Sequence, residues 1–160
     1  MGVALGYGFT LAVTDAGTVF SFRYCRCGAL GHGSLEAEML PRRIKALAQM
    51  RRRFVAVIAG YRHTLALTVE GELYGWGRGG VNDHGRNELD ADANGHRRNE
   101  LTPRQVASLD GHRVKHVDAG ALSSCSVTEK GELYTWGGGY LASWAMGMRR
   151  TRTRRSGWRG

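Results

Sequence analysis

One stretch of this sequence occurs three times, and this repetition limits the folds that the chain can adopt. Residues 59–77 read Ala-Gly-Tyr-Arg-His-Thr-Leu-Ala-Leu-Thr-Val-Glu-Gly-Glu-Leu-Tyr-Gly-Trp-Gly, and related copies lie at 5–23 and 119–137. The glycines that open the copies are Gly6, Gly60 and Gly120. In each copy two short runs of β-forming residues flank a turn with glycine, which predicts a β-hairpin. Hairpins repeated in this way are expected to pack against one another, because one hairpin alone buries too little apolar surface.

Further β-type runs accompany the hairpins. Residues 53–59 and 114–119 precede the second and third copies, whereas the first hairpin is expected to begin without a preceding strand. A run that opens with proline follows the first two hairpins, at 41–47 and 103–109, and its apolar positions correspond as Ile44 to Val106 and Leu47 to Leu109. Each unit is therefore predicted to have four short strands, with proline opening the first strand at a sheet edge, where a missing donor does little harm.

The repeat predicts an all-β fold built from propeller blades. The 160 residues include 24 glycines and only two prolines, as expected for many tight turns between short strands. A single four-stranded unit cannot bury both of its faces, so radial repetition is the natural solution. Helical repeats are disfavoured, because no stretch keeps an apolar period of 3.6 residues.

The repeat resembles that of the regulator of chromosome condensation family. The resemblance rests on Val55–Gly77, read as Val-x-x-Ile-Ala-Gly-x-x-His-Thr-Leu-Ala-Leu-Thr-x-x-Gly-Glu-Leu-Tyr-x-Trp-Gly, and on Gly28-Ala-Leu-Gly-His-Gly33. It implies a β-propeller of four-stranded blades, with about two and a half to three repeats within residues 1–139. It also implies a set of blade-building residues: Gly6, Gly17, Gly31, His32, Gly33, Gly60, His63, Gly71, Trp76, Gly77, Gly120, Gly131, Trp136 and Gly137.

The copies depart from the family pattern in places. Phe22 and Arg23 replace the Trp-Gly pair in the first copy, and Phe9 and Ser123 stand where the second copy has His63. The founding members of the family are seven-bladed, and a ring of that size needs roughly 350 residues at about 50 residues a blade. The expected structure is therefore an incomplete ring.

Residues 79–102 form a polar insertion in the second unit. Its mixed charges and scarcity of apolar side chains predict an exposed loop. Two interpretations stay open: a loop that contacts a partner, or a solvated insertion without a role, since surface loops tolerate extra residues.

The basic tail, residues 140–160, is predicted to be disordered. Much of the net charge of +9 comes from it, since six arginines and no acidic residue lie within 149–160. The family pattern should continue after Trp136-Gly137, but residues 141–149 do not match it. A shifted reading frame permits Gly-Lys-Leu-Gly-His-Gly from Leu141 onward, so one hypothesis is a frame change near Tyr140. The competing interpretation is a basic arm for nucleic acid or acidic lipid, with Trp158 stacking on a base.

The sequence offers no catalytic constellation, so no enzyme activity, cofactor or metal is expected. Ser123, Ser124 and Ser126 lack a nucleophile elbow, and His112 and His116 flank a β-run rather than sharing a helix face. Cys25 and Cys27 lack zinc or redox spacing, and Cys125 aligns with Leu11 and Leu65 as a buried apolar residue. The odd number of cysteines favours an intracellular setting, cytoplasmic or nuclear.

Three functions are compatible with these features. The first is a non-enzymatic protein-interaction module with a partner of unknown identity. The second, which the family resemblance implies, is guanine-nucleotide exchange on a small Ran-like GTPase. The third is a propeller segment of a larger protein, such as a HECT-type ubiquitin ligase. Because terminal blades would expose apolar faces and strand edges, the isolated chain is expected to be poorly soluble or to self-associate.

Overall fold

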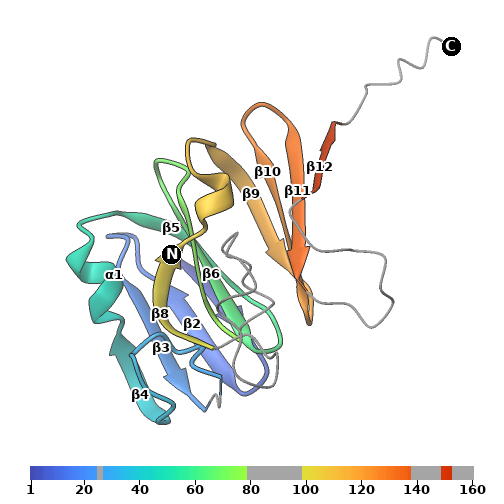
Figure 1. Cartoon of the computed structure of the whole chain (residues 1–160). Coiled ribbons are helices and arrows are strands. Elements are labelled where there is room, and N and C mark those ends of the chain that lie inside the picture. The colour runs from blue at the N-terminus through green and yellow to red at the C-terminus, as the bar shows by residue number, and fades with distance from the viewer. Residues whose placement is uncertain (25–26, 79–98, 138–148, 153–160) are drawn as a thin grey trace, which may run out of the picture.

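Three antiparallel sheets of four strands each make up the computed structural model of this chain (Figure 1). It describes residues 1–24, 27–78, 99–137 and the backbone of 149–152. Sheet 1 contains β1 (Gly2–Leu5), β2 (Phe9–Val13), β3 (Val19–Arg23) and β4 (Glu38–Arg43). Sheet 2 contains β5 (Phe54–Ala59), β6 (His63–Thr68), β7 (Leu73–Gly77) and β8 (Glu100–Gln105). Sheet 3 contains β9 (Val114–Ala119), β10 (Ser123–Thr128), β11 (Glu132–Gly137) and β12 (Arg149–Arg152).

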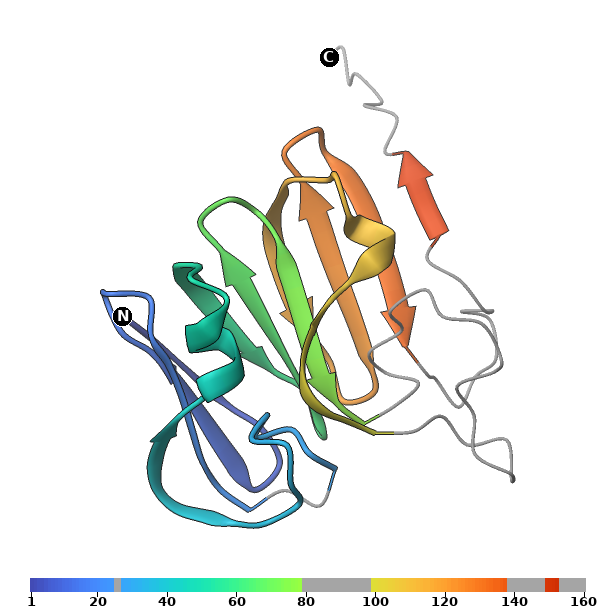
Figure 2. The ribbon, with the colours of Figure 1, turned by 60° about the vertical axis from the view of Figure 1, so that its left-hand side comes forward.

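The sheets stand next to one another as successive propeller blades, each one a simple meander (Figure 2). The first strand of each later sheet packs on the sheet before it: β5 contacts β1 and β2, and β9 contacts β5 and β6. Short helical segments follow two of the outer strands, α1 (Lys45–Gln49) after β4 and η2 (Ala107–Leu109) after β8. The predicted all-β fold of four-stranded antiparallel blades is confirmed.

The central hairpin of each blade closes on the same turn. The amide of the turn glycine donates to a threonine carbonyl three residues earlier, at 2.8 Å from Gly17 and 3.0 Å from Gly71. These glycines have φ of 79° and 84°, a conformation that disfavours side chains. The turn sequence therefore fixes the hairpin locally.

The prediction that the first hairpin lacks a preceding strand is wrong. Residues Gly2–Leu5 form β1, which pairs with β2 from Gly2 opposite Val13 to Leu5 opposite Thr10. Four residues are too few to display a clear alternation of apolar and polar side chains, so the strand left little trace in the sequence. Sheet 1 is consequently a full four-stranded blade.

The strand that contains proline is the last of its blade, not the first. Pro41 lies in β4, which pairs with β3, and Pro103 lies in β8, which pairs with β7. Both strands lie at a sheet edge, as expected for a residue without an amide proton. The residues after the proline strands were also predicted as β, but they turn into α1 and η2. The spacing of Ile44 and Leu47 explains this, because residues three apart share one face of a helical turn and both are buried.

Parts of the polar insertion and of the tail belong to strands. Residues 100–102 of the predicted insertion open β8, and 79–98 lie outside the described residues. In the tail, which was expected to be disordered, residues 149–152 instead form β12 antiparallel to β11. The open edge of β11 explains this, since its unpaired amides and carbonyls can form hydrogen bonds with an extended segment. Residues 138–148 and 153–160, with the proposed frame change, lie outside the described residues.

Each blade has two faces, which the burial of its second strand distinguishes. We call the side turned toward the next blade in sequence the forward face, and the opposite side the rear face. Forward residues of the second strands are Phe9, Leu11 and Val13 in sheet 1, His63, Leu65 and Leu67 in sheet 2, and Ser123, Cys125 and Val127 in sheet 3. Rear residues are Thr10 and Ala12, Thr64 and Ala66, and Ser124 and Ser126. All of β6 is buried, whereas β2 is fully buried only on its forward face and β10 only on its rear face.

Two apolar cores fill the spaces between neighbouring blades. The first joins forward residues of sheet 1, such as Leu11, to the rear-face Trp76 of sheet 2. The second joins Leu65 and Leu67 of sheet 2 to Trp136 of sheet 3. Cys125 aligns in register with Leu65, but it is only partly buried, because no further blade covers it in the described structure.

Candidate interaction surface

A tight turn joins the first and second strands of every blade at the glycine that opens each repeat. The amide of Gly60 donates to the carbonyl of His63 at 2.9 Å, and the equivalent bonds join Gly6 to Phe9 and Gly120 to Ser123, also at 2.9 Å. A Cβ atom on Gly60 would lie 2.0 Å from Cε1 of His63. Glycine here therefore makes room for the side chain three residues later.

His63 joins sheet 2 to sheet 3. Its side chain is fully buried, and Nε2 lies 2.9 Å from Oγ of Ser124 on the rear face of sheet 3. Burial lowers the pKa of His63 to about 4, so the ring is neutral at neutral pH. Since it faces a neighbouring blade and not solvent, His63 is placed to hold two blades together.

Trp76 joins sheet 2 to the loop that follows β3. Its Nε1 donates to the carbonyl of Ala29 at 2.7 Å, and the hydroxyl of Thr64 donates to the same carbonyl at 2.8 Å. A Cβ on Gly31 would lie 2.8 Å from Nε1 of Trp76, so glycine lets the loop approach the indole. The Gly-Ala-Leu-Gly-His-Gly stretch and the Trp-Gly pair are thus two sides of one contact between blades.

His32 and Gly33 secure the same loop. The Ser21 hydroxyl donates to the carbonyl of Leu30 at 2.7 Å, and Nε2 of His32 lies 2.9 Å from that hydroxyl oxygen. Burial, with the positive charge of Arg42, lowers the pKa of His32. The amide of Gly33 donates to the carbonyl of Leu101 in β8 at 2.9 Å. Both residues therefore stabilise the loop.

The glycines after the two tryptophans allow a strand end to pass a neighbouring loop. Gly77 and Gly137 have φ of 101° and 116°. A Cβ on Gly77 would lie 2.6 Å from the carbonyl oxygen of Arg62, and one on Gly137 would lie 2.4 Å from that of Leu122. In the described structure these glycines, like His63 and Trp76, pack against other parts of the chain and serve to hold the blades and loops together.

The turns after Gly6 and Gly60 meet the ends of β3 and β7, and these segments carry aromatic and arginine residues. This loop rim consists of Tyr7, Arg23, Tyr24, Tyr61, Arg62 and Arg78. The rings of Tyr7 and Tyr61 stack with centroids 4.3 Å apart and an interplanar angle of 21°. The guanidinium of Arg62 lies 5.2 Å from the centroid of Tyr61. Tyr7 is nevertheless 64% exposed and Tyr24 50% exposed, so the rim presents aromatic surface to solvent.

Backbone hydrogen bonds hold the rim in place. The amide of Tyr24 donates to the carbonyl of Gly8 at 2.9 Å, and that of Arg78 donates to the carbonyl of Arg62 at 2.9 Å. The amide of Tyr61 reaches the third blade, at 3.2 Å from the carbonyl of Ala121. The exposed rings are therefore mounted on fixed loops. This surface was not predicted from the sequence, although the tyrosines directly after Gly6 and Gly60 are a visible signal.

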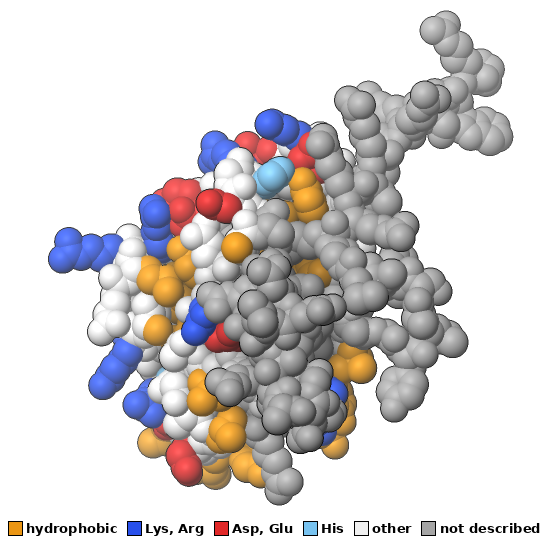
Figure 3. All heavy atoms as spheres, in the orientation of Figure 1, with side chains coloured by type: hydrophobic (Ala, Val, Ile, Leu, Met, Phe, Trp, Pro, Cys, Tyr) orange, Lys and Arg blue, Asp and Glu red, His pale blue; other side chains and the backbone are white. Residues whose placement is uncertain are grey.

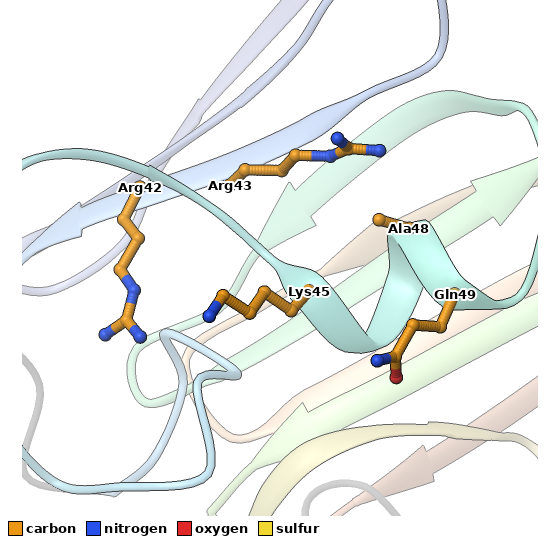
Figure 4. A pocket seen from close by; sticks show the side chains of 5 residues that line it. All are labelled: Arg42, Arg43, Lys45, Ala48 and Gln49. Carbon is orange, nitrogen blue, oxygen red and sulfur yellow. The ribbon is translucent and has the colours of Figure 1, made fainter.

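A second surface feature is a shallow basic hollow of about 400 Å³ beside α1, lined by Arg42, Arg43, Lys45, Ala48 and Gln49 (Figure 4). Arg43 extends away from Lys45, and Arg42 forms an ion pair with Glu38. On the face seen in Figure 3, basic side chains are interspersed with acidic ones. The cations of the hollow do not converge on one point, so the loop rim is the better candidate surface.

The described residues contain no group of three or more His, Cys, Asp or Glu side chains that could hold a metal ion. Among them there is also no helix long and apolar enough to cross a membrane.

Two family models with the description "Regulator of chromosome condensation (RCC1) repeat" match the sequence, one at residues 16–67 and one at 54–86. The chain contains RCC1 repeats within residues 16–86. The matched ranges include the hairpin glycines Gly17 and Gly71, together with His63 and Trp76, which join neighbouring blades.

Three curated relatives each match most of this chain. It is 34% identical over 139 residues to the ultraviolet-B receptor UVR8 of Arabidopsis thaliana, matching 86% of this chain and 29% of that protein. It is 35% identical over 149 residues to a secretion-regulating guanine nucleotide exchange factor of Bos taurus, matching 89% and 31%. It is 37% identical over 138 residues to the human E3 ubiquitin-protein ligase HERC2, matching 84% and 3%. The chain spans less than a third of the length of each of these relatives.

Solved structures share the fold. Human WBSCR16 superposes with a TM-score of 0.77 at 20% identity, covering 95% of this chain and 37% of that one. Yeast RCC1 (Prp20), solved with Kap60, superposes with a TM-score of 0.71 at 24% identity, covering 85% and 31%. The RCC1 β-propeller fold of the three blades is thus established independently of the sequence match.

Proposed function

We propose that this chain is a non-enzymatic protein-interaction module of the RCC1 type, and that the loop rim is its contact surface. The observation that carries the proposal is the stacked pair Tyr7–Tyr61: its loops are held by backbone hydrogen bonds, Tyr7 remains exposed and Tyr61 is partly buried. Tyrosine and arginine are enriched at protein interfaces, where they dominate the binding energy. Because the rings are already fixed, a partner would bind them with little loss of side-chain entropy.

The rim proposal can be tested before a partner is identified. A photo-crosslinking amino acid is placed at position 7 in the full chain, and the matched control carries it at Val69. Val69 is also half exposed, but it lies at the opposite hairpin end of its blade. We expect a discrete adduct with another protein from position 7 and none from Val69. Equal adducts from both positions, or none from either, would overturn the proposal.

A small GTPase is the partner class that we test first, with exchange activity as a second candidate function. This choice is supported by the relative named as a secretion-regulating guanine nucleotide exchange factor and by the family resemblance. The chain is added to a Ran-type GTPase loaded with fluorescent GDP, and nucleotide release is followed. Release at the intrinsic rate rules out exchange on that GTPase. Binding without acceleration, weakened by Tyr7→Ala and unchanged by Val69→Ala, supports the interaction module.

A third candidate is a propeller segment of a larger protein such as a ubiquitin ligase. The resemblance to HERC2 supports it, since this chain matches only 3% of that ligase. Sequencing the transcript on both sides of the coding region tests the candidate directly. An open frame that continues into further RCC1 repeats or a ligase domain is the supporting result, and stop codons on both sides contradict it.

We also propose an intracellular setting, cytoplasmic or nuclear, and a minor role at most for nucleic acid. The interspersed charges on the visible face favour a protein partner over a polyanion (Figure 3). Binding to duplex DNA that falls steeply between 50 and 200 mM salt would argue for the basic-arm interpretation instead.

A further inference from the structure

The rear face of sheet 1 is an open apolar surface of defined composition. Directly opposed residues on neighbouring antiparallel strands share a face, so the pairing register gives two rows across the sheet. These rows are Val3–Ala12–Phe20 and Leu5–Thr10–Phe22. Val3 is 65% exposed and Leu5 is 74% exposed. None of the six residues in these rows carries a charge.

The equivalent rows of the other two sheets are covered. They are Val57–Ala66–Tyr74 and Ala59–Thr64–Trp76 in sheet 2, and Val117–Ser126–Tyr134 and Ala119–Ser124–Trp136 in sheet 3. In both cases the cover is the forward face of the preceding blade. The protein itself thus shows which surface fits a rear face of this kind.

A forward face is also open, on sheet 3. Its central residues Cys125, Val127 and Leu133 are only partly buried, and Ser123 is exposed. The space around the hairpin-turn glycines also shows that the forward face of sheet 3 is uncovered. A Cβ on Gly71 would lie 3.0 Å from Cα of Arg113 in the next blade, whereas a Cβ on Gly131 would meet nothing within 4 Å among the described residues.

Two polar residues on the inner strand of sheet 3 are compatible with a covering blade. His116 and Asp118 occupy the positions of Ala56 and Ile58, as the register through Val127 and Cys125 shows. In sheet 2, which is covered on both sides, Ala56 and Ile58 remain partly exposed. Ala56 and Ile58 also pack against the second core, so after docking the imidazole and the carboxylate would lie beside the apolar contact with only part of their surface in water.

We infer that copies of this chain dock head to tail, with the rear face of sheet 1 of one copy on the forward face of sheet 3 of another. In this arrangement Ser123 of one copy lies opposite Thr10 of the other, as His63 lies opposite Ser124 within the chain. The two open surfaces repeat an interface that the chain already makes twice.

Head-to-tail contacts have a specific experimental consequence. Such an interface uses two different surfaces, so it builds rings or open chains and each copy has two distinct binding ends. Blocking either end in all copies prevents association. Mixing copies blocked at opposite ends restores a single interface and yields a dimer that cannot grow.

The test uses the full chain and sedimentation velocity between about 1 and 100 μM, the range where interfaces of modest quality assemble. The double variant Val3→Asp/Leu5→Asp blocks the rear end, and Val127→Asp blocks the forward end. Val69→Asp is the control, since Val69 is half exposed but lies on neither open face. Far-ultraviolet circular dichroism checks that each variant keeps the native strand content.

We expect the wild type and Val69→Asp to gain mass with concentration, both blocked variants to stay monomeric, and their mixture to form a dimer. A wild type that is monomeric throughout would overturn the inference. So would a mixture that stays monomeric, since two intact complementary faces would then fail to bind. A Val127→Asp variant that still associates by itself would also overturn it, since sheet 1 would then pair with itself. Should a blocked variant lose its strand content, hydrogen exchange on the wild type decides instead: β1 and β2 amides must exchange more slowly at 100 μM than at 1 μM, and equal rates refute the inference.

Discussion

The indole Nε1 of Trp76 donates a 2.7 Å hydrogen bond to the carbonyl oxygen of Ala29, 47 residues earlier in the chain and in the preceding blade. The two pieces of the repeat that look most distinctive in the sequence therefore meet across a blade boundary, not within one blade. A substitution in one blade is therefore expected to affect the stability of the neighbouring blade.

Replacing Trp76 tests the strength of this bond. Trp76→Phe keeps most of the buried ring but removes the donor, while Thr64 still satisfies the Ala29 carbonyl, so we expect a loss of about 1 kcal/mol in the free energy of unfolding. Trp76→Ala also leaves a cavity and should cost about 3–5 kcal/mol. Urea denaturation followed by circular dichroism measures both.

Trp136→Phe is the matched control for the indole bond. Trp136 is buried at the equivalent position, but its Nε1 has no hydrogen-bond partner among the described residues. Its replacement by phenylalanine should therefore cost less than Trp76→Phe. Equal losses at the two positions would show that the Ala29 bond adds nothing.

Acid should weaken the protein through His63. Its pKa of about 4 in the folded state lies below the unfolded value near 6.5, so the unfolded chain binds a proton first and stability falls as the pH drops below 6.5. From pH 7.5 to pH 5 this linkage removes about 2 kcal/mol. Urea midpoints at the two pH values measure the loss. His63→Gln should reduce the difference by most of that amount, and an unchanged pH dependence in this variant would contradict the assignment.

Gly60 and Gly120, which lie in the turns between the first and second strands of sheets 2 and 3, should respond differently to replacement by alanine. In Gly60→Ala the new methyl group would lie 2.0 Å from the buried His63 ring and 2.8 Å from the carbonyl oxygen of Gly120, and both contacts are too short to be kept without a shift. We expect a loss of about 1–3 kcal/mol or more. In Gly120→Ala the nearest atom is Oγ of Ser123 at 3.1 Å, and the loss should be below about 1 kcal/mol. Thermal unfolding of both variants makes the comparison.

A second glycine pair isolates the contact between blades. Gly71 and Gly131 occupy the same turn with φ of 84° and 75°, so alanine strains both backbones alike. Only at position 71 does the methyl group also press on the backbone of the next blade. Gly71→Ala should therefore be the more destabilising by about 1–3 kcal/mol in urea denaturation. Equal costs would show that the neighbouring blade yields freely.

The hairpins and the fold class could be predicted from the sequence because their causes are local. A turn glycine such as Gly71 and alternating apolar residues around it specify a hairpin within about fifteen residues. The placement of Pro41 at an edge follows equally from its missing amide proton. The order of strands within the blade could not be predicted in this way, since nothing in β4 itself says whether it pairs with the hairpin before it or after it.

The candidate surface was missed for a related reason. Tyr7 and Tyr61 are distant in sequence and meet only because neighbouring blades bring equivalent turns together. Cys125 shows the opposite error. Its alignment with Leu65 predicted burial, but burial depends on whether a further blade lies against that face. The contacts between neighbouring blades, and the number of blades that lie against a given blade, depend on how the blades are assembled. They cannot be read from the sequence of one repeat.

The complete burial of β6, against the half burial of β2 and β10, has a consequence for how this chain loses its structure. Two blades are supported on one side and the middle blade on both, so melting should start at the outside and reach β6 last. The interface between two blades is then the unit that contributes to cooperative stability. Adding or removing a terminal blade changes the number of such interfaces by one and leaves the others intact. A protein built in this way can gain or lose whole blades without changes to the residues of its middle blade.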